Sequence, residues 1–203
     1  NVFYHGKDLG RIRSGALGQH NVLNTLAAVA VGMELDLDFE VIANSLLQFE
    51  GVQRRFEIVK QSDELTLIDD YGHHPVEIKA SLKTVKEIWP TNRLVVIFQP
   101  HRYSRTKSLM KDFWSSFNDA DHLFVMDIFS AGESPLDKIH ASAIVEGARE
   151  YGHKNADYIK SQNDLNKQLH RLVKPGDVLM TLGAGDVWRL GRDFLAEKFL
   201  QKK

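Results

Sequence analysis

Two short segments of this chain gather side chains that bind anions and exchange protons. They are Asp69-Asp70-Tyr71-Gly72-His73-His74-Pro75 and Phe98-Gln99-Pro100-His101-Arg102-Tyr103-Ser104-Arg105-Thr106. Each segment follows a run that is apolar enough for a buried strand, and each leads into a predicted helix. Carboxylate, imidazole, phenol and guanidinium groups at two such turns predict a site for polar, anionic ligands.

The first segment allows a functional and a structural interpretation. Asp70 ends a strand, where its carboxylate could accept hydrogen bonds from a ribose diol. His73 and His74 precede Pro75, and the N-terminus of a helix favours an anion. Helix capping by one polar residue is the structural alternative, but it does not account for Tyr71 or for the second histidine.

The second segment predicts a binding site for a carboxylate or phosphate. Arg102 and Arg105 are three residues apart, and each guanidinium is a planar fork that suits such an anion. His101 lies beside them. A solvated basic loop that pairs with surface acids is the structural alternative.

Two weaker patterns lie elsewhere. Asn21 and Asn24, with His20 beside them, share a face at the start of a predicted helix and could match the edge of adenine, or else cap that helix. The segment Gly183-Ala184-Gly185-Asp186 follows a strand as a phosphate loop would, but Trp188 stands where a dinucleotide fingerprint needs glycine.

No Walker loop is present, and the spacing of Asp70, His73, His74 and His101 matches no strong metal motif.

The elements that must position these residues alternate along the chain. Apolar periodicity predicts strands at 2–4, 11–13, 56–60, 65–69, 93–98, 122–126, 156–160 and 177–182. It predicts helices at 22–33, 38–49, 75–89, 106–118, 139–151, 163–173 and 186–200. Strand–helix alternation indicates an α/β fold with a doubly wound, mostly parallel sheet. Ligands of such sheets bind at the carboxyl ends of the strands, where the loops 70–74, 99–105, 127–136 and 183–186 would meet.

The composition and charge of the chain limit the kinds of partner to expect. The chain has 203 residues, a formal net charge of −1 and no cysteine. The charge gives no reason to expect nucleic acid or an anionic membrane as partner, and no apolar run is long enough for a membrane span. Because the chain starts in mid-strand without methionine, we expect a piece of a longer protein, with a domain boundary between 1–51 and 52–203.

The motifs together resemble the Mur ligase family of bacterial peptidoglycan synthesis. The resemblance rests on the two opening segments and on Gly18-x-His20-Asn21-x-x-Asn24, Arg54-Arg55-Phe56, Ala131-Gly132-Glu133 and Gly183-Ala184-Gly185-Asp186. Within the family they are similar to the member that adds L-alanine to UDP-N-acetylmuramate. Val76 and Ser104 stand where threonine is expected.

The resemblance implies a cytoplasmic, ATP-dependent ligase that forms an acyl phosphate of UDP-N-acetylmuramate and transfers it to L-alanine. Residues 1–51 would be the end of the central ATPase domain, and residues 52–203 a Rossmann-like C-terminal domain. The UDP-sugar domain, the Walker loop and most Mg²⁺ ligands would lie upstream, so we expect the chain alone to be inactive.

The resemblance also implies residue roles. ATP would contact His20, Asn21, Asn24, Arg55 and Asp70. The L-alanine pocket would contain Tyr71, His73, His101, Arg102 and Arg105. Further matching positions are His74, Glu133, Gly183, Gly185 and Asp186. Three alternatives stay open: the related ligase that attaches a whole peptide during wall recycling, a metal-dependent hydrolase built on the histidines, and a ligand-binding module without catalysis.

Overall fold

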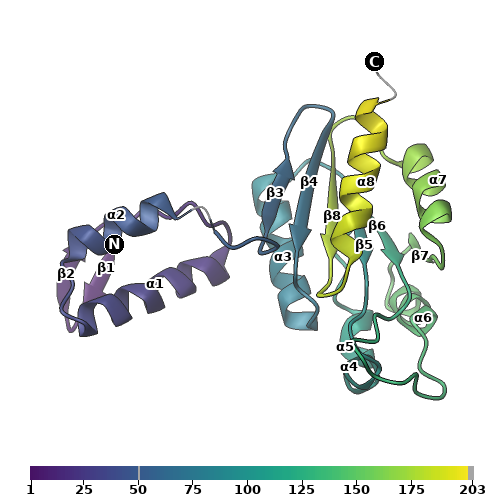
Figure 1. The fold of residues 1–203 in the computed structure, drawn as a ribbon, viewed down its shortest axis with the longest axis horizontal. Helices are drawn as coiled ribbons and strands as arrows, with labels where there is room; N and C mark the ends of the chain where they lie inside the picture. Colours follow the sequence, from purple (N-terminus) through teal and green to yellow (C-terminus); the bar gives the residue numbers. More distant parts are fainter. Residues whose placement is uncertain (50, 201–203) are drawn as a thin grey trace. The chain divides into compact units, whose positions relative to one another are not determined.

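The structure, a computed structural model, describes residues 1–49 and 51–200 and separates the chain into two compact units (Figure 1). The units are Asn1–Gln53 and Arg54–Lys203, so the boundary lies two residues after the predicted one. Within the described ranges, no helix combines the length and the apolar character that crossing a membrane requires.

The first unit is a hairpin with two helices. Its elements are β1 (Val2–Tyr4), β2 (Lys7–Gly10), α1 (Gln19–Glu34) and α2 (Phe39–Gln48). Val2, Val29 and Ile42 form a small core. Part of the apolar stripe that predicted α1 is exposed: Val22 and Leu23 keep 54% and 62% of their surface. This unit therefore buries little of its apolar surface.

The second strand of the hairpin lies earlier than predicted. The prediction placed it at 11–13, whereas Lys7 already pairs with Tyr4. His5 and Gly6 form the turn with φ values of 47° and 77°. Two consecutive positive φ angles suit a two-residue hairpin loop, which starts the return strand at once.

The second unit contains a six-stranded sheet in the order β3-β4-β8-β5-β6-β7. The strands are β3 (Glu57–Lys60), β4 (Leu65–Asp70), β5 (Leu94–Phe98), β6 (His122–Val125), β7 (Ala156–Tyr158) and β8 (Asp177–Leu182). β3 and β4 form an antiparallel hairpin, and all other pairs in this sheet are parallel. The helices are α3 (Pro75–Ile88), α4 (Tyr103–Ser108), α5 (Met110–Trp114), α6 (Ser142–Glu150), α7 (Gln162–Leu172) and α8 (Val187–Leu200).

Helices cover both faces of this sheet (Figure 1). On one face, side chains of α3, α5 and α6 join Val96 and Phe98 of β5 in a single core cluster. On the other face, α7 and α8 pack on Val95 and Ile97. The alternation of β5 residues between two cores explains why the strand is apolar throughout, and the predicted doubly wound, mostly parallel fold is confirmed.

The predicted helix at 106–118 is instead two short helices. α4 begins at Tyr103, and Leu109 interrupts the helix with φ −110° and ψ 13°. After this break, the rings of Phe113 and Phe117 pack on Phe98 with centroid distances of 5.5 and 5.0 Å. The periodicity located the buried aromatic residues but not the break between the two helices.

Candidate functional site

The carboxyl ends of four neighbouring strands finish level with one another. Leu182 at the end of β8 pairs with Asp70 of β4 and with Phe98 of β5. Phe98 also pairs with Val125, the last residue of β6. The loops that follow these strands therefore lie at one edge of the sheet, as predicted.

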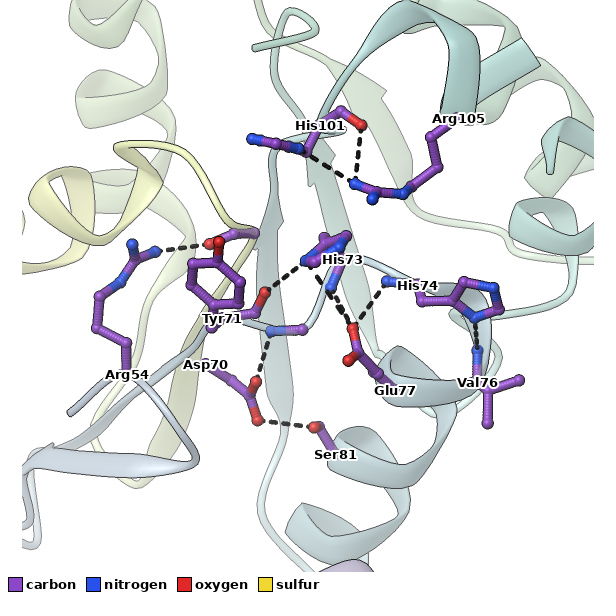
Figure 2. Close-up of polar contacts among 12 residues, drawn as sticks. Arg54, Asp70, Tyr71, His73, His74, Val76, Glu77, Ser81, His101 and Arg105 are labelled. Atoms are coloured by element: carbon purple, nitrogen blue, oxygen red, sulfur yellow. Dashed lines mark hydrogen bonds and ion pairs between the residues drawn. The ribbon is translucent and has the colours of Figure 1, made fainter. Parts of the chain in front are cut away.

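Asp70 is buried at this edge and shapes the turn after β4. Its Oδ1 accepts a hydrogen bond from the N–H of Gly72 at 2.6 Å, and its Oδ2 accepts one from the hydroxyl of Ser81 at 2.8 Å (Figure 2). A Cβ atom at Gly72 would lie 3.0 Å from Asp70 Oδ1, so the turn closes tightly on the carboxylate. Asp70 thus orders the turn, and its contact with a ribose stays a prediction.

Glu77 holds the next part of the turn and was not among the predicted site residues. Its Oε2 accepts hydrogen bonds from the N–H groups of His73 and His74 at 3.0 and 3.1 Å. His74 Nδ1 accepts the N–H of Val76 at 3.3 Å, which completes a capping box. Partial burial raises the pKa of Glu77, but the two backbone donors outweigh it and hold that pKa below its usual value. The glutamate three residues after the cap was the available sequence signal.

Arg54 links the end of strand β4 to the loop after β8, a role that the sequence analysis did not assign. Its Nε lies 3.1 Å from Asp69 Oδ2, and its Nη2 donates to the carbonyl of Gly183 at 2.6 Å. Asp69 is 1% exposed and also accepts the hydroxyl of Thr181 at 2.7 Å. Burial raises the pKa of Asp69, although Thr181 and Arg54 both stabilise its ionised form.

Arg55 has more freedom than Arg54. Its guanidinium lies 5.2 Å from the centroid of the Tyr71 ring and 3.7 Å from Glu77 Oε1. The side chain is 52% exposed. A half-exposed guanidinium with one loose ion pair is suited to an incoming phosphate.

Four rings form a row across the edge, from the β4 loop to the β6 loop. The centroids of Tyr71 and His73 are 5.4 Å apart, and those of His73 and His101 are 5.5 Å apart. His101 stacks on Phe129, with 5.6 Å between centroids and 11° between planes. The row places the two predicted histidines side by side, and Phe129 is a member that the sequence analysis missed.

The β5 loop presents its two arginines differently. Arg105 Nη1 lies 3.1 Å from His101 Nδ1, so this guanidinium is engaged within the site (Figure 2). Arg102 is exposed, and among the described residues its side chain makes no hydrogen bond or ion pair. Its backbone has a φ of 70°, and its N–H donates to the carbonyl of Phe129 at 2.8 Å. The β6 loop therefore holds a strained residue whose guanidinium faces solvent.

The remaining predicted residues make contacts between these loops. Glu133 accepts the N–H and hydroxyl of Ser104 at 3.0 and 2.6 Å at the start of α4. Asp186 accepts Gln99 Nε2 at 3.1 Å. A Cβ atom at Gly185 would lie 2.4 Å from Gln99 Oε1. Similarly, a Cβ at Gly183 would meet the Gln99 carbonyl at 2.7 Å. The glycines thus permit close contact between the β8 and β5 loops.

His20, Asn21 and Asn24 lie in the first unit, at the start of α1. Asn21 Nδ2 donates to the carbonyl of Leu17 at 2.7 Å, and Asn24 Nδ2 donates to Asn21 Oδ1 at 3.2 Å. Gly18 precedes the helix without a side-chain cap, so neither asparagine is the N-cap residue. The adenine contact of these residues stays a prediction.

Both site histidines favour the neutral form. Burial lowers the pKa of His73, and Arg105 and Arg55 lower it further. Burial likewise lowers the pKa of His101, with His73 and Arg105 acting in the same direction. In the described part of the chain, no three His, Asp, Glu or Cys side chains are grouped so as to hold a metal ion. The geometry thus offers neutral imidazoles and guanidinium groups to a polar ligand.

The chain is similar to known proteins in sequence and in fold. A family profile described as "Mur ligase, glutamate ligase domain" matches residues 54–185. The chain belongs to the Mur ligase family. It is 47% identical over 196 residues to a UDP-N-acetylmuramate–L-alanine ligase of Desulfosudis oleivorans, and 44% identical over 194 residues to the enzyme of that name from Geobacter sulfurreducens.

Solved structures agree in fold. The UDP-N-acetylmuramate-alanine ligase of Thermotoga maritima matches 95% of the chain with a TM-score of 0.78 and 30% identity. A murein peptide ligase from Psychrobacter arcticus matches 91% with a TM-score of 0.69 and 20% identity, which shows the shared fold alone. The two sequence relatives match 97% and 96% of this chain, but the chain spans only 43% and 42% of their lengths. It covers 40% of the Thermotoga structure and 38% of the Psychrobacter one.

Proposed function

We propose that this chain supplies the amino-acid-binding part of a ligase that joins L-alanine to UDP-N-acetylmuramate in peptidoglycan precursor synthesis. The observation that carries the proposal is the pairing of His101 with Arg105 beside the exposed Arg102. Two guanidinium groups and an imidazole at one loop suit the carboxylate of a small amino acid. The two sequence relatives are named UDP-N-acetylmuramate–L-alanine ligases, which supports L-alanine as that amino acid.

The proposed reaction is amide formation driven by ATP. The lactyl carboxylate of UDP-N-acetylmuramate takes the γ-phosphoryl group, and the amine of L-alanine then displaces phosphate from the acyl carbon. The contribution of this chain is to bind, orient and shield the amino acid. Tyr71, His73 and His101 form the ring row against which it would lie.

The proposal assigns ATP and Mg²⁺ mainly to parts of the ligase outside this chain. Residues 1–51 would be the end of the central ATP-binding domain, and residues 52–203 the C-terminal domain. The half-exposed Arg55 fits a phosphate contact, whereas the described residues contain no grouped metal ligands. We infer a cytoplasmic enzyme without nucleic-acid or membrane partners, and we expect no product from the chain alone. Turnover by the purified chain would contradict that expectation.

Replacing Arg102 by alanine in the ligase that contains this chain tests the proposal. Loss of one partner of a charged, partly desolvated pair costs about 2–5 kcal/mol. The KM for L-alanine should therefore rise roughly 30-fold or more, with little change in the KM for ATP. Lys107→Ala, which removes an exposed cation from α4, the short helix that begins directly after Arg102, is the matched control.

An unchanged KM for L-alanine in Arg102→Ala would remove Arg102 from the carboxylate site. The related murein peptide ligase is the rival function. If the wild-type ligase joined a peptide to UDP-N-acetylmuramate in preference to L-alanine, that result would favour the rival. Binding of L-alanine with neither release of phosphate nor formation of an amide would instead indicate a ligand-binding module.

A further inference from the structure

The hydrogen-bond partners of His73 define which of its ring nitrogens carries the proton. His73 Nδ1 lies 3.1 Å from the carbonyl oxygen of Tyr71 (Figure 2). A carbonyl oxygen only accepts, so Nδ1 is the protonated nitrogen and Nε2 carries the free lone pair. Glu77 Oε2 lies 3.9 Å from the same Nδ1 and favours the same tautomer.

The partner of His101 defines the opposite tautomer. Arg105 Nη1 lies 3.1 Å from His101 Nδ1. A guanidinium only donates, so Nδ1 of His101 carries the lone pair and Nε2 carries the proton. Stacking on Phe129 at 11° between planes fixes the plane of this ring. Two adjacent imidazoles therefore offer one acceptor and one donor through the same kind of nitrogen.

The charges around the rings favour these neutral tautomers over the imidazolium form. Guanidinium groups dominate, and carboxylates are in the minority. The charged groups that act on His73 are Arg105, Glu77 and Arg55, and those that act on His101 are Arg105, Arg102 and Glu133. Burial and the guanidinium groups lower the pKa of each ring, so both tautomers are populated at neutral pH.

We propose that the two histidines bind opposite ends of the incoming amino acid, with His101 donating its Nε2–H to the carboxylate and His73 Nε2 accepting from the ammonium. His73 then takes the proton that must leave before nitrogen can attack. One N–H bond of the ammonium breaks and its electron pair stays on nitrogen, while a new N–H bond forms at Nε2 of His73. This assignment rests on the proposed ligase function and makes His73 a catalytic residue of that reaction.

Nitrogen-15 NMR of the histidine rings in the purified chain tests the tautomers without any activity. We expect His73 to appear as the Nδ1–H tautomer and His101 as the Nε2–H tautomer at neutral pH, with His73→Gln and His101→Gln identifying the signals. His140→Gln, which changes an exposed histidine, is the control for the spectra. The same tautomer in both rings, or a protonated His73, would overturn the proposal.

Kinetics of the ligase that contains this chain test the separate roles. General-base catalysis contributes about 10²–10⁴-fold, so kcat/KM of His73→Gln for L-alanine should fall at least about 100-fold at neutral pH. The kcat/KM of this variant should recover as pH rises, because the ammonium group then loses its proton without a base. His101→Gln should raise the KM for L-alanine without such recovery, because the contact that this variant loses is with the carboxylate and not with the ammonium.

Hydroxylamine in place of L-alanine provides the matched comparison, because it is largely unprotonated at neutral pH and needs no base to react with an acyl phosphate. The fold-loss of His73→Gln with hydroxylamine should be less than a tenth of its loss with L-alanine. Equal losses with both nucleophiles would overturn the role of His73. If the wild-type ligase formed hydroxamate but transferred no L-alanine, the proposed function would fail, while the tautomers would still be read from the spectra.

Discussion

Replacing Arg54 by alanine should destabilise the second unit strongly, because it leaves a buried carboxylate without its counter-charge. Arg54 lies 3.1 Å from Asp69 Oδ2 and donates to the Gly183 carbonyl at 2.6 Å. The Asp69 side chain is 2% exposed. Breaking one partner of a buried pair costs about 3–5 kcal/mol. Thr181 keeps its 2.7 Å hydrogen bond to Asp69, so we expect a loss near the lower end, about 3 kcal/mol.

Unfolding in urea, followed by tryptophan fluorescence, measures this loss in the second unit. All three tryptophans, Trp89, Trp114 and Trp188, belong to that unit. With a urea dependence of roughly 2 kcal/mol/M, the midpoint should fall by about 1.5 M. The adjacent Arg55→Ala is a matched control, because its half-exposed ion pair at 3.7 Å should contribute less than about 1 kcal/mol.

The pH dependence gives a second check on Arg54→Ala. Burial raises the pKa of Asp69 in the folded chain, so the folded state binds this proton more tightly than the unfolded state. Protonation relieves the unpaired charge, and the loss should therefore be smaller at acidic pH than at neutral pH. A loss no larger than that of Arg55→Ala, or one independent of pH, would refute the reasoning.

Two further predictions concern the same unit. His153 is 7% exposed and burial lowers its pKa, so its contribution to stability is present above the unfolded pKa of about 6.5 and is lost as pH falls below it. His153→Leu should flatten the acid side of urea unfolding measured against pH, and an unaltered acid slope would contradict this. Gly185→Ala would place a Cβ 2.4 Å from Gln99 Oε1 and 2.8 Å from Phe129, which should cost roughly 1–3 kcal/mol in the same assay. Gly132→Ala, at a φ of 87° with nothing within 4 Å, should cost about 1 kcal/mol, and a larger loss there than at Gly185 would count against the packing argument.

Local patterns were sufficient to predict the fold class of the second unit. Strands such as Leu94–Phe98 are apolar on both sides because helices cover both faces of the sheet. Pro75 marked the start of α3 because its ring suits the first helical position. The break at Leu109 was not predictable in this way, because packing of Phe113 and Phe117 on Phe98 involves residues from different elements.

The sequence also predicted the edge of the sheet at which the candidate site residues lie. Tyr71, His73, His101 and Arg105 were expected there because they follow strands whose carboxyl ends meet. Glu77 carried a capping signal, whereas Phe129 gave none that distinguished it from an ordinary core aromatic. Its stacking on His101 depends on β5 and β6 being neighbours in the sheet.

Residue types and their spacing thus determined the chemistry available to this protein: guanidinium, imidazole and carboxylate groups at the ends of buried strands. The partners of each group, in contrast, depend on the folded chain. The tertiary structure buried Asp70 in its own turn, paired Arg54 with Asp69, and gave His73 and His101 different partners. The reason is physical: the proton position on an imidazole and the charge on a carboxylate depend on atoms within a few ångströms, and those atoms come from distant parts of the chain.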